Sequence, residues 1–262
     1  MLRAITRDVS PAIESCELAF LERKSIDYSL AVRQLEAYRA ALRNCGVAVT
    51  ELAEESAYPD ACFVEDTAII VDELAVICNL GALSRRGETT AIELELSKSR
   101  EIVRIAPPAT IDGGDVLRVG RTILVGLSSR TNIAGINDLV RILVPFGYRV
   151  KPITVTGCLH FKSACTAIND ETLLVNREWV DANALDGYRL LDVAVGEPWA
   201  ANLLRVNETV FVQGGFPITA QKIREIHDSV EILDVSEFQK AEASLTCLSL
   251  LFTSKNTQRQ AY

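Results

Sequence analysis

The chain has 262 residues, of which 48% are hydrophobic and 24% charged; this composition is typical of globular proteins and excludes low-complexity disorder, collagen and coiled coil. Its net charge of −8, from 27 basic and 35 acidic residues, argues against nucleic acid and anionic membrane surfaces as partners. No run approaches the roughly 18 apolar residues of a membrane span, and the N-terminus lacks a signal-peptide core. We therefore predict a soluble, cytoplasmic protein.

The first predicted element is a helix over residues 27–46, in which Asp27 is the N-cap and Gly46 the stop. Beyond it the chain alternates short apolar runs with turns. Strands are predicted at 63–71 and 75–78, followed by a helix that ends near residue 97. A second pass gives strands at 116–119 and 122–126 and a helix to about residue 146. The two passes form a loose repeat, because Asp66 and Asp115 lie 49 residues apart before equivalent strands.

Weaker copies of this repeat follow. One begins at residues 160–164 and includes a strand at 172–175, and another has strands at 201–206 and 209–212 and a helix at 219–227. The last predicted strand, 244–252, has no helix after it, so the N-terminal strand at 3–9 would complete its unit. Repeats of this length favour a ring of ββαβ units, and alternating helices disfavour a pure β-propeller. Since no linker divides the chain, we predict one domain over 1–254 and a polar tail over 255–262.

The rare residues are the most informative about chemistry. The chain has two histidines, His160 and His227, and seven cysteines. An odd number of cysteines at irregular spacing, with no Cys-x-x-Cys pair, indicates reduced thiols and gives no support for a zinc site. We expect most of these cysteines to be small buried hydrophobes.

Residues at equivalent ends of the repeats would converge on the axis of such a ring. The positions with functional groups are Glu65, Asp66, Asp112, Asp115, His160 and Cys247, with Arg85 and Arg130 at matching loop positions. A cysteine and a histidine are the minimum for a thiolate nucleophile, and a carboxylate beside the histidine would orient it. Other carboxylates could hold a cation next to the sulfur. Two arginines could bind a substrate carboxylate.

Structural explanations compete with the catalytic one at each position. Cys247 in an apolar run is, on base rates, a core thiol, and His160 could equally be a hydrogen-bonded core histidine. Glu65 and Asp66 could be turn residues, although two adjacent acids are costly to bury without a cation. Gly113 and its neighbour Gly114 could permit a tight turn, and no phosphate-binding motif surrounds them.

Several motifs in chain order carry a family resemblance. The segment 59–66 resembles the PDxxFVED signature of the dimethylarginine dimethylaminohydrolase family. Further matches to that family are Ser-Arg-Arg at 84–86, Asp-Gly-Gly-Asp-Val-Leu at 112–117, Ser-Arg-Thr-Asn at 129–132, Leu-His-Phe-Lys-Ser at 159–163, Ala-Asn at 201–202 and Leu-Thr-Cys at 245–247. The motifs follow the family's order, and together they cover about residues 18–252. The resemblance implies the pentein fold, a five-bladed α/β propeller.

The resemblance also implies an activity, the hydrolysis of N-omega-methylated arginine to citrulline and an alkylamine without a metal or organic cofactor. In that reaction Cys247 would be the nucleophile, His160 the proton donor and Asp112 the residue that orients the histidine. The residues implied to contact the substrate are Leu18, Asp60, Glu65, Asp66, Arg85, Arg130 and Ala241.

Each implied contact serves one part of the substrate. Asp66, assisted by Glu65, would bind the guanidinium group, and the two arginines would bind the carboxylate. Backbone carbonyls of Leu18, in a lid over 15–24, and of Ala241 would contact the α-amino group, and Asp60 would line the same pocket. The sequence departs from the family pattern at 241–244, Ala-Glu-Ala-Ser, where the family often has Asp-Gly.

Two alternatives stay open at the level of sequence. Arginine deiminase, or another amidine hydrolase, would use the same core, but arginine deiminases carry a further helical domain for which 262 residues leave no room. A catalytically silent propeller that serves as a binding module is the second alternative. No long heptad pattern marks an oligomer seam, so both a monomer and a homodimer are compatible with the sequence.

Overall fold

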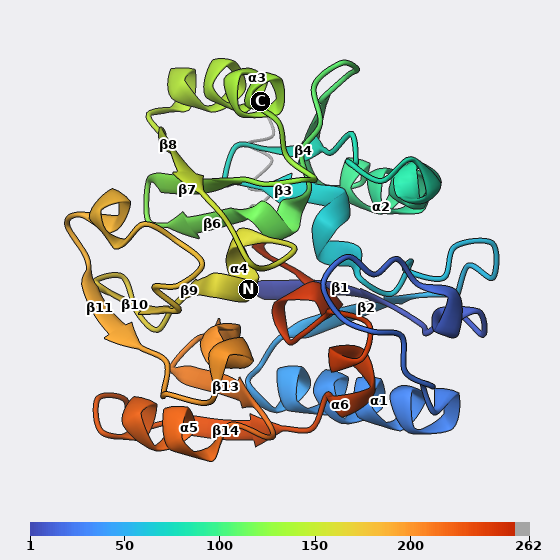
Figure 1. Ribbon diagram of the computed structural model, residues 1–262. Coiled ribbons are helices and arrows are strands. Elements are labelled where there is room, and N and C mark those ends of the chain that lie inside the picture. Colours follow the sequence, from blue (N-terminus) through green and yellow to red (C-terminus); the bar gives the residue numbers. More distant parts are fainter. Residues whose placement is uncertain (255–262) are drawn as a thin grey trace.

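Short apolar runs separated by turns fold into five small sheets in a ring, as Figure 1 shows for the computed structural model, which describes residues 1–254. The first blade has strands β3 (Ala68–Ile70), β4 (Leu74–Ile77) and β5 (Glu101–Arg104). The second has β6 (Val116–Val119), β7 (Thr122–Leu127) and β8 (Arg149–Thr154). The third has β9 (Cys165–Ala167), β10 (Thr172–Val175) and β11 (Arg189–Asp192), and the fourth β12 (Leu203–Val206), β13 (Thr209–Gln213) and β14 (Val230–Leu233). The fifth has β15 (Leu250–Thr253), β1 (Leu2–Arg7) and β2 (Ala48–Leu52).

Each blade pairs its strands in the same way. The first two strands form an antiparallel hairpin, as in the pairing of Ala68 with Ile77, and the third joins the middle strand in parallel. A parallel partner requires a crossover connection, which is helical in four blades. These helices are α1 (Tyr28–Asn44), α2 (Thr89–Ser97), α3 (Ile133–Leu143) and α5 (Pro217–Arg224). The third blade instead crosses over through the 3-10 turn η6 (Ala182–Leu185).

The fifth blade closes the ring. Strand β1 pairs antiparallel with β15, with Leu2 opposite Thr253, and parallel with β2. The two ends of the described chain therefore meet in one sheet (Figure 1), which confirms the split unit expected from the sequence. The predicted tail, 255–262, lies outside the described residues.

Apolar side chains from neighbouring blades share a core at each boundary. Val76 of the first blade and Val125 of the second lie in one cluster, with no exposed surface. Helix α1 contributes Leu35, Tyr38 and Leu42 to the cluster under the fourth and fifth blades. The apolar stripe of that helix therefore packs inward as its spacing indicates.

Two predicted strands, 63–71 and 244–252, are wrong in their first halves. Residues Val64–Thr67 (η2) and Thr246–Leu248 (η8) are 3-10 turns that precede β3 and β15. Thr67 stabilises the first of these turns, because its hydroxyl donates to the Val64 carbonyl at 2.7 Å. This local side-chain hydrogen bond competes with a strand ladder.

A short helical turn stands before the inner strand of every blade. The other three are η4 (Gly113–Asp115), α4 (Phe161–Ala164) and η7 (Pro198–Ala201). The remaining short elements are η1 (Ile13–Ser15), η3 (Leu83–Glu88), η5 (Val144–Phe146) and α6 (Ser236–Gln239). Among the helices of residues 1–254, none combines the length and apolar character needed to cross a membrane.

The N-cap of α3 provides a test of these local determinants. The Asn132 side chain accepts from the Gly135 amide at 2.8 Å and the Thr110 amide at 3.1 Å, and donates to the Pro108 carbonyl at 3.0 Å. Asp27 is the N-cap of α1. Within residues 1–254, its side chain accepts one hydrogen bond, from the Leu30 amide at 2.9 Å. We predict that Asn132→Ala lowers the free energy of unfolding by about 2 kcal/mol and Asp27→Ala by about 1 kcal/mol. Urea unfolding measures both losses, and equal losses would contradict the assignment of the additional bonds.

Candidate active site

The functional side chains meet in one narrow pocket at the axis of the ring. Its walls contain seven of the predicted site residues: Asp60, Asp66, Arg85, Arg130, His160, Ala241 and Cys247. They also contain Glu17, Phe63, Leu159, Glu242 and Ala243. The three other predicted residues, Leu18, Glu65 and Asp112, lie behind or beside these walls. The convergence expected from the repeats is therefore present.

The five turns before the inner strands explain this convergence. Asp66 lies on η2 and Cys247 on η8, while Asp112 and His160 are the residues just before η4 and α4. Turn η2 contacts both η4 and η8, and η4 contacts α4. Since the turns are equivalent parts of a ring, side chains about 50 to 180 residues apart in the sequence become neighbours.

Cys247 is held as a neutral thiol in the free protein. Burial, together with the negative charges of Glu65 and Asp66, raises the pKa of the thiol to about 12. The amide of Ser244 lies 3.5 Å from the sulfur and donates to it. This amide would favour the thiolate once a cation enters the pocket.

His160 is held between two carboxylates. Its Nε2 lies 3.0 Å from Asp112 Oδ2, and its Nδ1 lies 3.8 Å from Asp66 Oδ1. Burial opposes the charged imidazolium, but the charge of Asp66 and the bond to Asp112 outweigh it and raise the pKa of His160 to about 9. The histidine is therefore an acid near neutral pH.

Asp112 has a geometry suited to orienting this histidine. It has no exposed surface, and its second oxygen, Oδ1, accepts from the Gly81 amide at 2.8 Å. Its own amide donates to the Thr131 hydroxyl at 3.1 Å. With the backbone and the other oxygen both bonded, Asp112 cannot rotate away from His160.

Asp66 is bonded through both of its carboxylate oxygens. It accepts from Arg85 Nη1 at 2.7 Å and from the Gly114 amide at 2.9 Å. Burial acts against its charge, but His160 and Arg85 outweigh this and lower the pKa of Asp66 to about 2. A Cβ at position 114 would lie 2.6 Å from both Asp66 and His160, so glycine is required there for close approach rather than for a turn.

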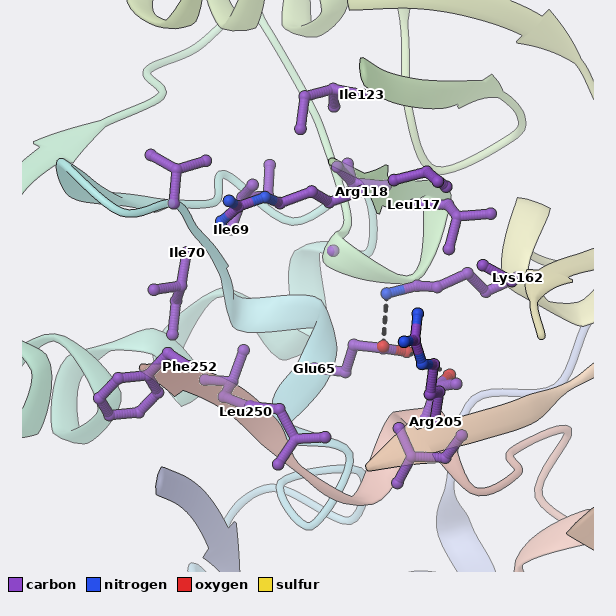
Figure 2. Close-up of a pocket in the computed structure, with 18 of the residues that line it drawn as sticks. Glu65, Ile69, Ile70, Leu117, Arg118, Ile123, Lys162, Arg205, Leu250 and Phe252 are labelled. Carbon is purple, nitrogen blue, oxygen red and sulfur yellow. Dashed lines mark hydrogen bonds and ion pairs between the residues drawn. The ribbon is translucent and has the colours of Figure 1, made fainter. Parts of the chain in front are cut away.

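Glu65 faces away from this pocket. Its carboxylate forms an ion pair with Lys162 and accepts from the Thr246 hydroxyl at 2.7 Å. Figure 2 shows the Glu65–Lys162 pair in a second pocket, which is lined by inner strands such as β3 and β6. Glu65 therefore affects Cys247 in two indirect ways: it bonds the neighbouring Thr246, and its negative charge raises the pKa of the thiol.

Arg85 and Arg130 differ in how fully their guanidinium groups are hydrogen-bonded. Nε, Nη1 and Nη2 of Arg85 all have partners, the closest being Asp66 at 2.7 Å and Glu88 at 2.9 Å. In contrast, the buried Nη1 of Arg130 has no hydrogen-bond partner among the described residues, and the nearest acid oxygen, Asp112 Oδ2, lies 4.0 Å away. A buried cationic N–H without a partner is costly, so Arg130 keeps a donor in this pocket that could bind an anion.

The opposite wall carries carboxylates and a lid. Asp60 is buried and accepts from the Glu17 amide at 3.1 Å, and burial raises the pKa of Asp60. Leu18 lies next along the chain in the predicted lid. The carboxylate of Glu242 accepts from the amides of the following lid residues, beginning with Ala19.

Four further residues support the site; Asp115 is among those expected at the axis, whereas Glu88, Lys162 and Thr246 could not be assigned from the motifs. Glu88 is buried against Arg85, and burial raises its pKa to about 7; its position three residues after Arg85 is the one signal available. Asp115 accepts from the Phe161 amide at 2.8 Å and so anchors the turn after His160. Lys162 and Thr246 sit inside quoted motifs, but nothing in the sequence pairs them with Glu65.

Two groups of acidic or histidine residues in the described chain have the spacing of a metal site: the exposed Asp8, Glu36 and Glu51, and a buried group at the axis. The ligand atoms of Asp66, Asp112 and His160 lie within 4.8 Å of one another. The Asp112 carboxylate already bonds to the His160 imidazole, and the Asp66 carboxylate accepts from Arg85 and from the Gly114 amide. Both carboxylates of the buried group are therefore already paired with N–H donors. The expectation that no metal is needed stays a prediction.

The pKa of His160 leads to a prediction about stability. Because folding raises this pKa from 6.5 to about 9, its contribution is complete below pH 6.5 and is lost as the pH rises through about 9. We expect the free energy of unfolding to fall by about 2 kcal/mol more between pH 7 and pH 9 in the parent than in His160→Gln. Urea unfolding at both pH values measures this difference, and parallel curves for the two proteins would contradict the assigned shift.

The chain was compared with known proteins. A family model for eukaryotic N,N-dimethylarginine dimethylhydrolase matches residues 12–181. The N(G),N(G)-dimethylarginine dimethylaminohydrolase of Pseudomonas aeruginosa is 33% identical over 86% of this chain and 90% of its own length. The Streptomyces coelicolor enzyme of that name is 34% identical over 95% of this chain and 96% of its own length.

Solved structures agree with these matches. A Cys-to-Ser mutant of the Pseudomonas aeruginosa enzyme complexed with citrulline has a TM-score of 0.90 and 31% identity, covering 95% of this chain and 98% of its own. The N-terminal domain of ArgZ, an arginine dihydrolase from cyanobacteria, is 16% identical with a TM-score of 0.84, covers 97% of this chain and 99% of its own, and shares the fold. The fold is the pentein propeller, and the chain belongs to the dimethylarginine dimethylaminohydrolase family.

Proposed function

We propose that this protein hydrolyses N-omega-methylated arginines, namely asymmetric dimethylarginine and monomethylarginine, to citrulline and dimethylamine or methylamine. The observation that carries the proposal is a pocket in which Cys247 faces the His160–Asp112 pair, while Arg130 has an unbonded N–H. A thiol, an acid and an anion-binding group are the parts needed to cleave a guanidinium group attached to an amino acid.

The pocket complements both ends of this substrate. Asp66 and the thiol would hold the guanidinium, with the leaving nitrogen near His160. At the other end Arg130 would bind the carboxylate, and Arg85 keeps one N–H on Nη1 beyond its bond to Asp66. The α-ammonium would lie between Asp60 and the carbonyls of Leu18 and Ala241. Glu65 would assist only indirectly, by fixing Thr246 beside the nucleophile.

The electrostatics suggest that the substrate activates the nucleophile. The thiol of Cys247 has a pKa of about 12 because it is buried beside carboxylates. A guanidinium bound against the sulfur would offset those negative charges and favour the thiolate. The thiol would then lose its proton to solvent, and the reactive anion would form only when its target is in place.

The reaction would proceed in two halves. The thiolate attacks the guanidinium carbon and forms a carbon–sulfur bond, giving a tetrahedral adduct. The His160 imidazolium donates its proton to the alkylamine nitrogen, and the carbon–nitrogen bond breaks with release of the amine. This leaves a covalent S-alkylthiouronium on Cys247.

The second half returns the enzyme to its starting state. The neutral His160 takes a proton from water as the oxygen attacks the same carbon. The carbon–sulfur bond then breaks, the sulfur takes up the proton that the new hydroxyl group loses, and citrulline leaves. His160 carries the proton to the amine and takes one from the water, and solvent accepts the thiol proton, so we propose that neither a metal nor an organic cofactor takes part.

A relative and the cysteines support the wider proposal. The Pseudomonas aeruginosa neighbour with the Cys-to-Ser substitution is complexed with citrulline, the product proposed here. All seven cysteines of the described chain are free thiols, which suits a reducing cytoplasm. We propose that the enzyme works there as one domain, as a monomer or a homodimer, with a small molecule and not nucleic acid or membrane as its partner.

The first functional prediction concerns substrate and nucleophile. We expect citrulline from dimethylarginine and monomethylarginine, and no citrulline from either with Cys247→Ser, because the hydroxyl is a far weaker nucleophile. A colorimetric citrulline assay with both substrates and with arginine measures this. Faster turnover of arginine would identify an arginine deiminase, and no product from any substrate would favour a silent binding module.

The second functional prediction concerns the substrate carboxylate. Removing the open guanidinium with Arg130→Gln should raise the KM for dimethylarginine about 100-fold, because two charge-assisted hydrogen bonds are lost. The kcat should change much less, since the carboxylate is remote from the reacting carbon. Arg86→Gln is the matched control, because Arg86 donates to the Leu80 carbonyl and does not line the pocket. An unchanged KM in Arg130→Gln would remove Arg130 from the site.

A further inference from the structure

Glu242 adopts a backbone conformation that glutamate rarely takes. Its φ is +57°, and the other non-glycine residue of the described chain with positive φ is Asn207, a type that tolerates this region. The left-handed conformation costs a residue with a Cβ about 1 kcal/mol. Such strain persists where surrounding contacts impose it, and it often marks a functional position. Its neighbours Ala241 and Ala243, like Glu242, line the substrate pocket.

The side chain of Glu242 binds the lid. Its carboxylate accepts from the amides of three successive residues: Ala19 at 3.0 Å, Phe20 at 2.6 Å and Leu21 at 2.5 Å. Consecutive N–H groups that converge in this way form an anion-binding nest, here occupied by a carboxylate more than 200 residues away in the sequence. Glu242 therefore latches the lid to the loop that precedes Cys247.

Leu18 of the lid packs against the core under the fourth and fifth blades, but packing contributes little at the next two residues. Ala19 and Phe20 are exposed, with 46% of Phe20 accessible. A cavity of about 590 Å³ lies beside the latch, with Phe20, Leu21 and Glu242 in its wall, and it leaves space for the lid to move. The three hydrogen bonds to Glu242 are therefore the main contacts that fix this part of the lid.

The latch also sets the direction of two carbonyl groups. In a trans peptide the C=O and N–H point in opposite directions. The Ala19 amide points to Glu242, so the Leu18 carbonyl of the same peptide points away from it. The Glu242 amide donates to the Gln239 carbonyl at 3.2 Å, so the Ala241 carbonyl points away from Gln239. One residue thus orients both carbonyls that the proposed function assigns to the α-ammonium.

We propose that Glu242 is a positioning residue that makes the site selective for substrates with a free α-ammonium group. This inference rests on the proposed function, because it assumes a guanidino amino acid in the pocket. The carboxylate holds the Leu18 and Ala241 carbonyls as acceptors and adds negative charge to the wall that contains Asp60. Des-amino or N-acylated guanidino acids offer no such cation, so they gain nothing from the latch.

The test compares the binding of two ligands to the full chain carrying Cys247→Ser, which consumes neither. The ligands are asymmetric dimethylarginine and its des-amino analogue, N-omega,N-omega-dimethyl-5-guanidinopentanoate, and calorimetry measures the Kd of each. Glu242→Gly removes the carboxylate but accepts the left-handed backbone. Glu242→Gln keeps one acceptor oxygen, and Glu22→Gln is the matched control, because Glu22 is an exposed lid carboxylate without a contact to the nest.

We expect Glu242→Gly to weaken dimethylarginine binding roughly tenfold or more while the Kd of the des-amino analogue changes little. Glu242→Gln should be intermediate, and Glu22→Gln should keep the parent's preference. Trypsin cleavage after Lys24 should also be faster in Glu242→Gly, whereas its thermal midpoint should stay close to the parent's.

Three results would overturn this inference. An unchanged preference in Glu242→Gly, or an equal loss for both ligands in a folded variant, would leave Glu242 with a general structural role. A changed preference in Glu22→Gln of the same size would indicate lid charge rather than the latch. If the parent releases no amine from dimethylarginine and its Cys247→Ser form binds neither ligand, the proposed function fails instead and the inference falls with it.

Discussion

The site depends on the buried charge of Asp66. This carboxylate accepts from Arg85 and from the Gly114 amide, and it faces the imidazole of His160. It remains ionised in a place with almost no water because these groups outweigh the cost of burial. The same charge raises the pKa of His160 and opposes ionisation of Cys247. One buried anion therefore favours the protonated form of both the His160 imidazole and the Cys247 thiol.

Most other buried charges around the site are paired, whereas one guanidinium N–H, on Arg130, is not. Glu88 forms an ion pair with Nη2 of Arg85. Lys162 forms an ion pair with Glu65 in the second pocket. Each pair is costly to break, because removing one partner leaves a buried charge alone. Against this background the unpartnered Nη1 of Arg130 is an exception among the charged side chains that line this pocket in the described chain. In the proposed function, the substrate carboxylate would be the partner that Arg130 lacks.

The propeller separates a rigid part of the site from an adjustable part. Asp66, Asp112, His160 and Cys247 lie on or beside short turns that contact one another at the axis, and their backbones are fixed by the blades behind them. The wall that would meet the α-amino group is built differently, from a half-exposed lid held by hydrogen bonds to Glu242. In the proposed function, the rigid turns would carry the chemistry and the lid the selection of substrate, where a change of residue disturbs the fold least.

Composition, the repeat of apolar runs and the ordered motifs were sufficient to predict the five-bladed ring, its closure by the N-terminal strand and the residues that converge on the axis. These follow from local patterns, since strand periodicity and turn residues act over a few positions. The sequence by itself could not distinguish strand from turn at Glu65 or Cys247, because side-chain hydrogen bonds and contacts across the ring override an apolar run. It also could not decide which buried charges pair. The contacts of Glu65 with Lys162, of Arg85 with Glu88 and Asp66, and of Glu242 with the lid depend on distances in three dimensions, and these arise only when the blades close around the axis.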